Sequence, residues 1–269
     1  MPTIEFITLN YVCPLLGTIA VYAVYAAPVN DLKRCLKKGT LGDMNSTPWA
    51  FMTGNTLGWV IYSFLVEDIF ILVSNAPGLI ISYWLNSGAS KLQFSKQGTS
   101  LTQIPSRNDQ NGIESVISYQ EKLVLSILTF WLLGLTIIFQ FLNGVFDAEE
   151  QKNAIGFMAM SNLVFFWGSP LSTIVTVCTN KNSSSIHIPT MITNSICSFF
   201  WCVYGLAKVD YFIFSPNLAG VFLGFLQVLL CAWYPRSALG MEYPRSTLRM
   251  DEIRMADEEN DSSPQGSLL

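Results

Sequence analysis

Long apolar segments alternate along the chain with short polar and charged ones. An α-helix needs about 20 predominantly apolar residues to cross the hydrocarbon core of a bilayer. Segments of about this length lie at 7–27, 48–66, 70–88, 124–144, 156–178, 190–207 and 212–234. Lipid offers no hydrogen-bond partners to the backbone, so such segments are predicted to be helices. The pattern therefore predicts an all-α membrane protein with seven transmembrane helices.

The two ends of this pattern repeat each other at an offset of 142 residues. The matched pairs are Pro28 and Pro170, Trp59 and Trp201, Tyr62 and Tyr204, Asp68 and Asp210, Asn75 and Asn217, and Gly78 and Gly220. Self-similarity at a fixed offset indicates an internal duplication. Transporters built by duplication bind their substrates between the repeats, near the middle of the bilayer.

The repeat also predicts the domain organisation. Residues 7–88 form a first triple-helix bundle, 89–121 a polar cytosolic loop, 122–145 a linker helix, 154–235 a second triple-helix bundle, and 236–269 a disordered cytosolic tail. Three crossings reverse the side on which a chain emerges. A single linker helix therefore lets both bundles have the same orientation, giving parallel repeats in a 3+1+3 arrangement.

The charged residues predict the orientation of the chain in the membrane. Only 13% of the residues are charged, against about 25% in soluble domains. Of the 15 Lys and Arg residues, all except Lys152 and Lys208 follow the first, third or fifth span or lie in the tail. The positive-inside rule then places the N-terminus outside and the C-terminus in the cytosol. We expect a multi-pass protein of the plasma membrane, with an endomembrane as the alternative.

The predicted spans contain no Asp, Glu, Lys, Arg or His. Proton-coupled carriers and intramembrane hydrolases need titratable or metal-binding groups within the membrane. Their absence from the spans favours passive movement of a neutral solute and argues against an enzyme. The six cysteines have no metal-binding spacing, so we expect neither a metal nor another cofactor. The expected partners are a small neutral molecule and the lipid bilayer rather than nucleic acid. A homo-oligomer is the alternative to a monomer.

Two repeat-related pairs of side chains suit a saccharide. The carboxamides of Asn75 and Asn217 both donate and accept hydrogen bonds, as sugar hydroxyls do. The indoles of Trp59 and Trp201 offer flat apolar faces for a sugar ring. The alternative is that these four side chains only pack helices together or face lipid.

Four prolines and two tyrosine–aspartate pairs are candidate gates. Pro28 and Pro170 match at the offset, and Pro48 and Pro189 match within one residue. Proline kinks a helix, so a layer of four prolines would form an inner gate. The alternative for Pro48 and Pro189 is an ordinary place in the first helical turn. The tyrosines and aspartates of the repeat are a candidate outer gate, with ordinary interfacial tyrosines as the alternative: Tyr62, Tyr204, Asp68 and Asp210.

These motifs resemble the SWEET (MtN3/saliva) family of sugar transporters. The resemblance rests on residues 27–34 (APVNDLKR), 55–62 (NTLGWVIY), 201–206 (WCVYGL) and 216–227 (PNLAGVFLGFLQ). It implies a facilitative, bidirectional carrier of mono- or disaccharides that works by alternating access. It also implies that the asparagines and tryptophans bind the sugar, that the prolines form the inner gate, and that the tyrosines belong to the outer gate.

In this family, the positions four residues before the landmark proline and tryptophan matter for substrate size. Here they are Val24, Asn55, Phe166 and Cys197. Phe166 is bulky where smaller residues are usual, which predicts a narrow pocket that favours hexoses such as glucose over sucrose. The chain departs from the family in its longer 89–121 loop, in Ser63 where the second half keeps Gly205, and in the register of Pro48 and Pro189.

Two other functions remain as alternatives. A related PQ-loop carrier of amino acids in acidic organelles would have an intramembrane acid and Pro-Gln dipeptides at its kinks, whereas the single Pro264-Gln265 lies in the tail. A seven-helix receptor would not need a 3+1+3 repeat.

Overall fold

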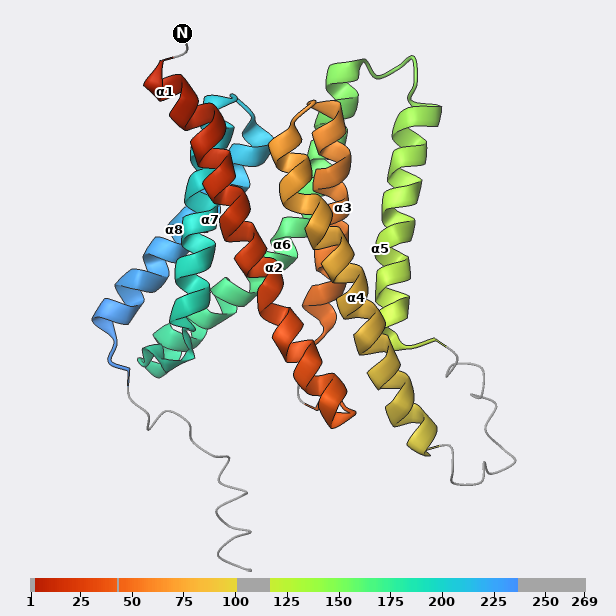
Figure 1. Cartoon of the computed structure of the whole chain (residues 1–269), viewed down its shortest axis with the longest axis vertical. Helices are drawn as coiled ribbons and strands as arrows, with labels where there is room; N and C mark the ends of the chain where they lie inside the picture. The colour runs from red at the N-terminus through yellow and green to blue at the C-terminus, as the bar shows by residue number, and fades with distance from the viewer. Residues whose placement is uncertain (1–2, 43, 101–116, 237–269) are drawn as a thin grey trace, which may run out of the picture.

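The computed structural model describes residues 3–42, 44–100 and 117–236, with the side chains of 95–100, 164–167 and 169 left aside. Nearly all of these residues are helical (Figure 1). The elements are α1 (Ile4–Ile7), η1 (Thr8–Val12), α2 (Cys13–Lys38), α3 (Thr47–Leu65), α4 (Ile69–Ser100), α5 (Tyr119–Thr136), η2 (Ile137–Phe141), α6 (Ala148–Asn180), η3 (Ser183–Ser185), α7 (Ile188–Ala207) and α8 (Tyr211–Trp233). The predicted all-α class is confirmed.

Each of the seven predicted segments overlaps a helix or a continuous helical run, with ends that differ from the prediction; the run at 124–144, for example, ends at Phe141. Five of these runs are long and apolar enough to cross a membrane: Ile4–Lys38, Ile69–Phe94, Tyr119–Phe141, Ile188–Ala207 and Tyr211–Trp233. Helix α3 is not among these five, and it carries Thr53, Asn55 and Thr56, all of which are buried. Its polar side chains face protein rather than lipid.

The predicted loop at 89–121 begins too early. Helix α4 continues to Ser100, and residues 101–116 lie outside the described residues. The polar composition of the segment suggested a loop, but Ala89 and Leu92 are buried in a cluster with Leu32 of α2. A Cβ on Gly88 would lie only 2.6 Å from Leu32 Cδ2, so the two helices approach closely there. This packing against α2 stabilises α4 beyond residue 88. The predicted tail at 236–269 lies, apart from its first residue, outside the described residues.

The helix contacts repeat in the two halves. At the 142-residue offset α2, α3 and α4 correspond to α6, α7 and α8, and the contacts α2–α4 and α3–α4 recur as α6–α8 and α7–α8. The halves meet through α2–α7 and α3–α6, while α5 packs mainly on α3 and α4. Figure 1 shows the α3–α4, α5–α6 and α7–α8 connections at the upper end, together with the N-terminus. The α2–α3 and α6–α7 connections lie at the lower end.

A buried polar network attaches α5 to the first half. Asn86 of α4 donates to the carbonyls of Trp49 and Ser82, at 3.0 and 2.7 Å, and to the Thr53 hydroxyl at 2.9 Å. Gln120 of α5 donates to Asn86 Oδ1 at 2.5 Å. Gln120 also exchanges hydrogen bonds with Ser46, which caps α3. The corresponding positions of the second half carry Ile188 in place of Ser46 and Val228 in place of Asn86. Only the first half therefore has this network.

Removal of the Asn86 side chain should loosen the attachment of α5. We expect Asn86→Ala to lower the unfolding free energy by about 1–3 kcal/mol, because buried partners lose their hydrogen bonds. Thermal unfolding of the detergent-solubilised protein measures the change. Ser126→Ala is the matched control, since this exposed α5 hydroxyl bonds only its own helix at Lys122. Equal stability of the two variants would contradict a structural role for the network.

Candidate functional site

Two tyrosine–aspartate bridges join the halves at the upper end of the bundle. The Tyr62 hydroxyl of α3 donates to Asp210 Oδ2 at 2.8 Å. The Tyr204 hydroxyl of α7 donates to Asp68 Oδ2 at 2.5 Å. Both tyrosines are buried, each with 1% of its surface exposed. The predicted gate residues thus meet across the repeat, each tyrosine with the aspartate of the other half.

The aspartates are positioned by helix capping. Asp68 Oδ1 accepts from the Phe70 backbone N–H at 2.9 Å, and Asp210 Oδ1 accepts from that of Phe212 at 2.9 Å. Aspartate is a favoured N-cap because it satisfies free N–H groups and complements the helix dipole. One carboxylate oxygen of each residue therefore holds the start of α4 or α8, and the other receives the tyrosine.

The turns before these caps are equally symmetric. Glu67 and Val209 have φ values of 52° and 54°, in the left-handed region. This conformation is costly for a β-branched residue such as Val209. The following amides close the turns, since Asp68 N–H donates to Ser63 O at 3.0 Å and Asp210 N–H donates to Gly205 O at 2.9 Å. The tight turns place each carboxylate beside the opposite half.

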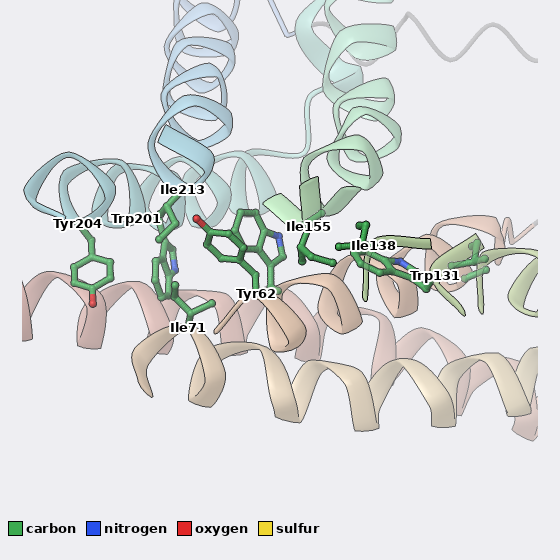
Figure 2. Packing of buried hydrophobic residues seen from close by; sticks show 12 residues of the cluster. Tyr62, Ile71, Trp131, Ile138, Ile155, Trp201, Tyr204 and Ile213 are labelled. Atoms are coloured by element: carbon green, nitrogen blue, oxygen red, sulfur yellow. The ribbon is translucent and has the colours of Figure 1, made fainter. Parts of the chain in front are cut away.

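Aromatic packing continues the symmetry below the bridges. Trp59 packs edge-on against Tyr62, and Trp201 against Tyr204, each pair with centroids 5.7 Å apart. Tyr62 also contacts Phe212 across the repeat at 5.9 Å, as Tyr204 contacts Phe70 at 6.1 Å. Figure 2 shows the buried cluster to which these residues belong; its labelled members are Tyr62, Ile71, Trp131, Ile138, Ile155, Trp201, Tyr204 and Ile213.

A vestibule of about 950 Å³ lies at this end of the bundle, and the bridging residues form part of its lining. Its charged lining includes Glu67, Glu149, Lys152 and Lys208. The Lys208 ammonium lies 5.6 Å from the centre of the Tyr204 ring. The vestibule therefore combines acidic and basic side chains with the two tyrosine–aspartate bridges, which join the halves in its lining.

The two tryptophans are buried to the same extent but differ in their partners. Trp59 Nε1 donates to Asn55 Oδ1 at 3.2 Å, which joins two predicted site residues on α3. Trp201 lies against Gly17 of α2, where an added Cβ would come within 2.9 Å of the indole Nε1. The Cys197 thiol lies 4.0 Å from the Gly17 carbonyl. Tryptophan and cysteine of α7 thus share one small-residue contact on α2.

The two asparagines also differ. Asn75 is buried and accepts a hydrogen bond from the Tyr25 hydroxyl at 3.0 Å. Asn217 is half-buried and donates to the Ile213 carbonyl at 2.7 Å. No hydrogen bond joins Asn75 to Asn217 within the described part of the chain. Val24 is half-buried on α2, whereas the side chain of Phe166 lies outside the described residues.

The four candidate proline hinges occupy two kinds of position. Pro48 and Pro189 lie in the first turns of α3 and α7, as their helix-start alternative predicted. Pro28 and Pro170 lie inside α2 and α6. A proline in a helix interior leaves the carbonyl four residues earlier without its N–H partner. The hinge role therefore rests on Pro28 and Pro170 more than on the other two.

Sequence reasoning missed the residues that hold Asn75. These are Tyr25, which lies on α2, and Ser74, whose hydroxyl accepts from Asn75 Nδ2 at 3.1 Å. Their repeat positions carry Trp167 and Pro216, so a search for matched pairs passes over both. The i, i+3 spacing of Tyr22 and Tyr25 was the available signal, because it places two hydroxyls on one helix face.

Loss of both tyrosine hydroxyls should open the vestibule end. Hydrogen bonds to charged groups contribute about 1.5–3 kcal/mol each, so we expect Tyr62→Phe/Tyr204→Phe to raise the open population at least about tenfold. Pulsed electron resonance measures it, with spin labels on cysteines replacing Ile69 and Tyr211 in a background without the native cysteines. These exposed positions start α4 and α8 and are themselves repeat-related. The exposed Tyr119→Phe serves as control, and unchanged distances in the double variant would exclude the gate.

Comparisons with known proteins agree with this geometry. A family described as "Sugar efflux transporter for intercellular exchange" matches residues 11–85 and 153–239, two ranges whose first residues are 142 apart. The chain is 23% identical over 230 residues to the sugar transporter SWEET1 of Dictyostelium discoideum, covering 83% of this chain and 92% of that protein. It is 27% identical over 228 residues to the bidirectional sugar transporter SWEET11 of Arabidopsis thaliana, covering 84% and 71%.

The fold has a solved counterpart. A eukaryotic SWEET transporter superposes with a TM-score of 0.65 at 22% identity, covering 83% of this chain and 95% of the other. The family match takes in both halves of the repeat and more than half of the chain. The predicted family is confirmed: the chain belongs to the SWEET family of sugar transporters.

Proposed function

We propose that this protein is a facilitative, bidirectional uniporter that moves hexoses such as glucose down their gradient. The observation that carries the proposal is the pair of reciprocal bridges, Tyr62–Asp210 and Tyr204–Asp68. They close one end of the interface between the repeats, directly above buried tryptophans. Such a closure suits a protein that encloses a solute between two equivalent halves.

The side chains below the closure suit a neutral, hydroxyl-rich solute. Asn75 and Asn217 offer amide groups, and Trp59 and Trp201 offer apolar faces to the C–H face of a sugar ring. The charged residues that belong to the closure, Asp68 and Asp210, lie at helix starts. With neutral groups around the solute, net flow follows its concentration gradient and needs no coupling ion.

Alternating access would follow from movement of the two triple-helix bundles, 7–88 and 154–235. Their interface consists mainly of the contacts α2–α7 and α3–α6. Bending at Pro28 and Pro170 would change the lower end while the tyrosine–aspartate bridges open or close the upper end. Four prolines, with Pro48 and Pro189, would form the inner gate.

The orientation proposed for this cycle comes from the distribution of positive charge. The vestibule end would face the outside of the plasma membrane, together with the N-terminus. The seven helices would cross the bilayer in a 3+1+3 arrangement, and the C-terminal tail would lie in the cytosol.

Glucose uptake into proteoliposomes without any ion gradient tests the proposal. We expect saturable uptake and counterflow by the wild type. Asn75→Ala and Asn217→Ala should each raise the KM for glucose about tenfold, because a buried hydrogen bond to the sugar is lost. Asn143→Ala is the control, since this exposed asparagine lies in the α5–α6 connection, outside both the vestibule lining and the proposed site. Uptake that requires a proton gradient would overturn the proposal.

The side chain of Phe166 is proposed to set the upper size of the substrate. We expect the wild type to transport glucose much faster than sucrose. Phe166→Val should raise the ratio of sucrose to glucose uptake at least about threefold, because removing part of an aromatic ring enlarges the pocket. Val24→Ala, at the repeat-related position, is the matched control for a general loosening of the site. Equal rates for the two sugars in the wild type would show that Phe166 does not restrict the pocket.

A further inference from the structure

The two asparagines of the proposed site are related by the repeat, yet their hydrogen bonds are not equivalent. Asn75 Nδ2 donates to the Ile71 carbonyl at 2.9 Å and to the Ser74 hydroxyl at 3.1 Å. Its oxygen accepts from the Tyr25 hydroxyl at 3.0 Å. A carboxamide has two N–H donors and two acceptor lone pairs. The Ser74 hydroxyl itself lies 2.9 Å from the Ile71 carbonyl, so these two acceptors sit together on one side of Nδ2, whereas the two N–H bonds of an amide point apart. On the other side of the carboxamide, Tyr25 takes one lone pair of the oxygen.

Asn217 makes fewer contacts. The Asn217 amide donates to the Ile213 carbonyl at 2.7 Å, which corresponds to the Ile71 contact in the first half. Pro216 stands where the first half has Ser74, and Trp167 stands where it has Tyr25. Neither position of the second half carries a hydroxyl group. Among the side chains that the structure describes, Asn217 has this one hydrogen bond.

The position of Tyr25 is built by close packing. The tyrosine is buried, with 6% of its surface exposed. Its ring lies against Gly78 of α4, where an added Cβ would come within 2.4 Å of Tyr25 Cε2. Gly78 lies one turn after Asn75, so the absence of a side chain there lets the ring reach the carboxamide.

We propose that Tyr25 is a positioning residue that holds the oxygen of the Asn75 carboxamide and so makes the sugar site asymmetric. This inference rests on the proposed transport of glucose. Tyr25 takes one lone pair of Asn75 and holds its carboxamide in one orientation. No tyrosine stands at the repeat-related position, where the chain has Trp167. An asymmetric sugar therefore meets two different carboxamides, which orients it between two otherwise equivalent halves.

Tyr22 provides a matched control on the same helix face. Its hydroxyl also joins α2 to α4, donating to the Val73 carbonyl at 2.8 Å. That carbonyl lies four residues before Pro77, which has no N–H to give it. Tyr22→Phe therefore removes one tyrosine hydroxyl between the same two helices without touching Asn75. A general loosening of the α2–α4 contact should affect both variants alike.

The experiment is a thermodynamic cycle in proteoliposomes, in which a protein substitution and the removal of one sugar hydroxyl are made separately and together. Inhibition of glucose uptake by the deoxyglucoses, each lacking one ring hydroxyl, is measured for the wild type, Tyr25→Phe and Tyr22→Phe. We expect Tyr25→Phe to raise the KM for glucose about 5- to 10-fold with little change in kcat, as loss of one oriented hydrogen bond predicts. For one particular sugar hydroxyl, we also expect its removal to weaken inhibition of glucose uptake less in Tyr25→Phe than in the wild type. In Tyr22→Phe, the loss of inhibition should equal that of the wild type.

Coupling between Tyr25 and one sugar hydroxyl supports the inference, because groups that do not interact give additive effects. Additive effects at every hydroxyl, or the same pattern in Tyr22→Phe, would overturn it. Gly78→Ala is a second route, since its methyl group displaces the Tyr25 ring without removing the hydroxyl, and it should give the same coupling. Glucose uptake by the wild type separates the two proposals: without uptake the transport function fails, and uptake without coupling contradicts only the role of Tyr25.

Discussion

The need to satisfy polar groups where little water is available governs this structure. In each tyrosine–aspartate bridge both carboxylate oxygens have hydrogen-bond partners. One oxygen caps a helix, and the other accepts a hydrogen bond from a tyrosine hydroxyl of the opposite half. An unsatisfied polar group in an apolar environment costs several kcal/mol. The caps, the tight turns and the aromatic cluster below them therefore act together, and two hydrogen bonds join the halves at the vestibule end.

Duplication gave the two halves a common plan, but different chemistry holds them together. In the first half, α3 and α4 are joined through Thr53, Ser82 and Asn86, and the network reaches α5. In the second half, α7 and α8 meet through small residues, since a Cβ on Gly224 would lie 2.0 Å from the Ser195 hydroxyl oxygen. Ser195 is the repeat partner of Thr53, and Gly224 that of Ser82. A polar contact and a close backbone approach thus serve the same helix crossing. The polar contacts between helices that the structure describes for the linker helix and its cap all reach the first half.

Much of the fold followed from pattern alone. The apolar segments predicted the helices, and the offset of 142 residues predicted which side chains are equivalent. The pairing of each gate tyrosine with the aspartate of the opposite half did not follow, because the offset relates the halves without showing how they meet. The predicted end of this helix at residue 88 was wrong because Ala89 and Leu92 lie in a polar stretch and become buried only against α2. Tyr25 was missed because it has no matching residue in the repeat.

By itself, the sequence determined the helical class, the duplication, the family and the candidate residues of the site. Helix formation in an apolar segment is a local requirement of the backbone, and a repeat is visible in the order of residues. The tertiary structure decided that Tyr25 contacts the Asn75 carboxamide and which tyrosine meets which aspartate. It also decided that the linker attaches to the first half. Those outcomes depend on contacts between segments far apart in the chain, where a hydroxyl or a missing Cβ on one helix determines what a side chain on another can bind.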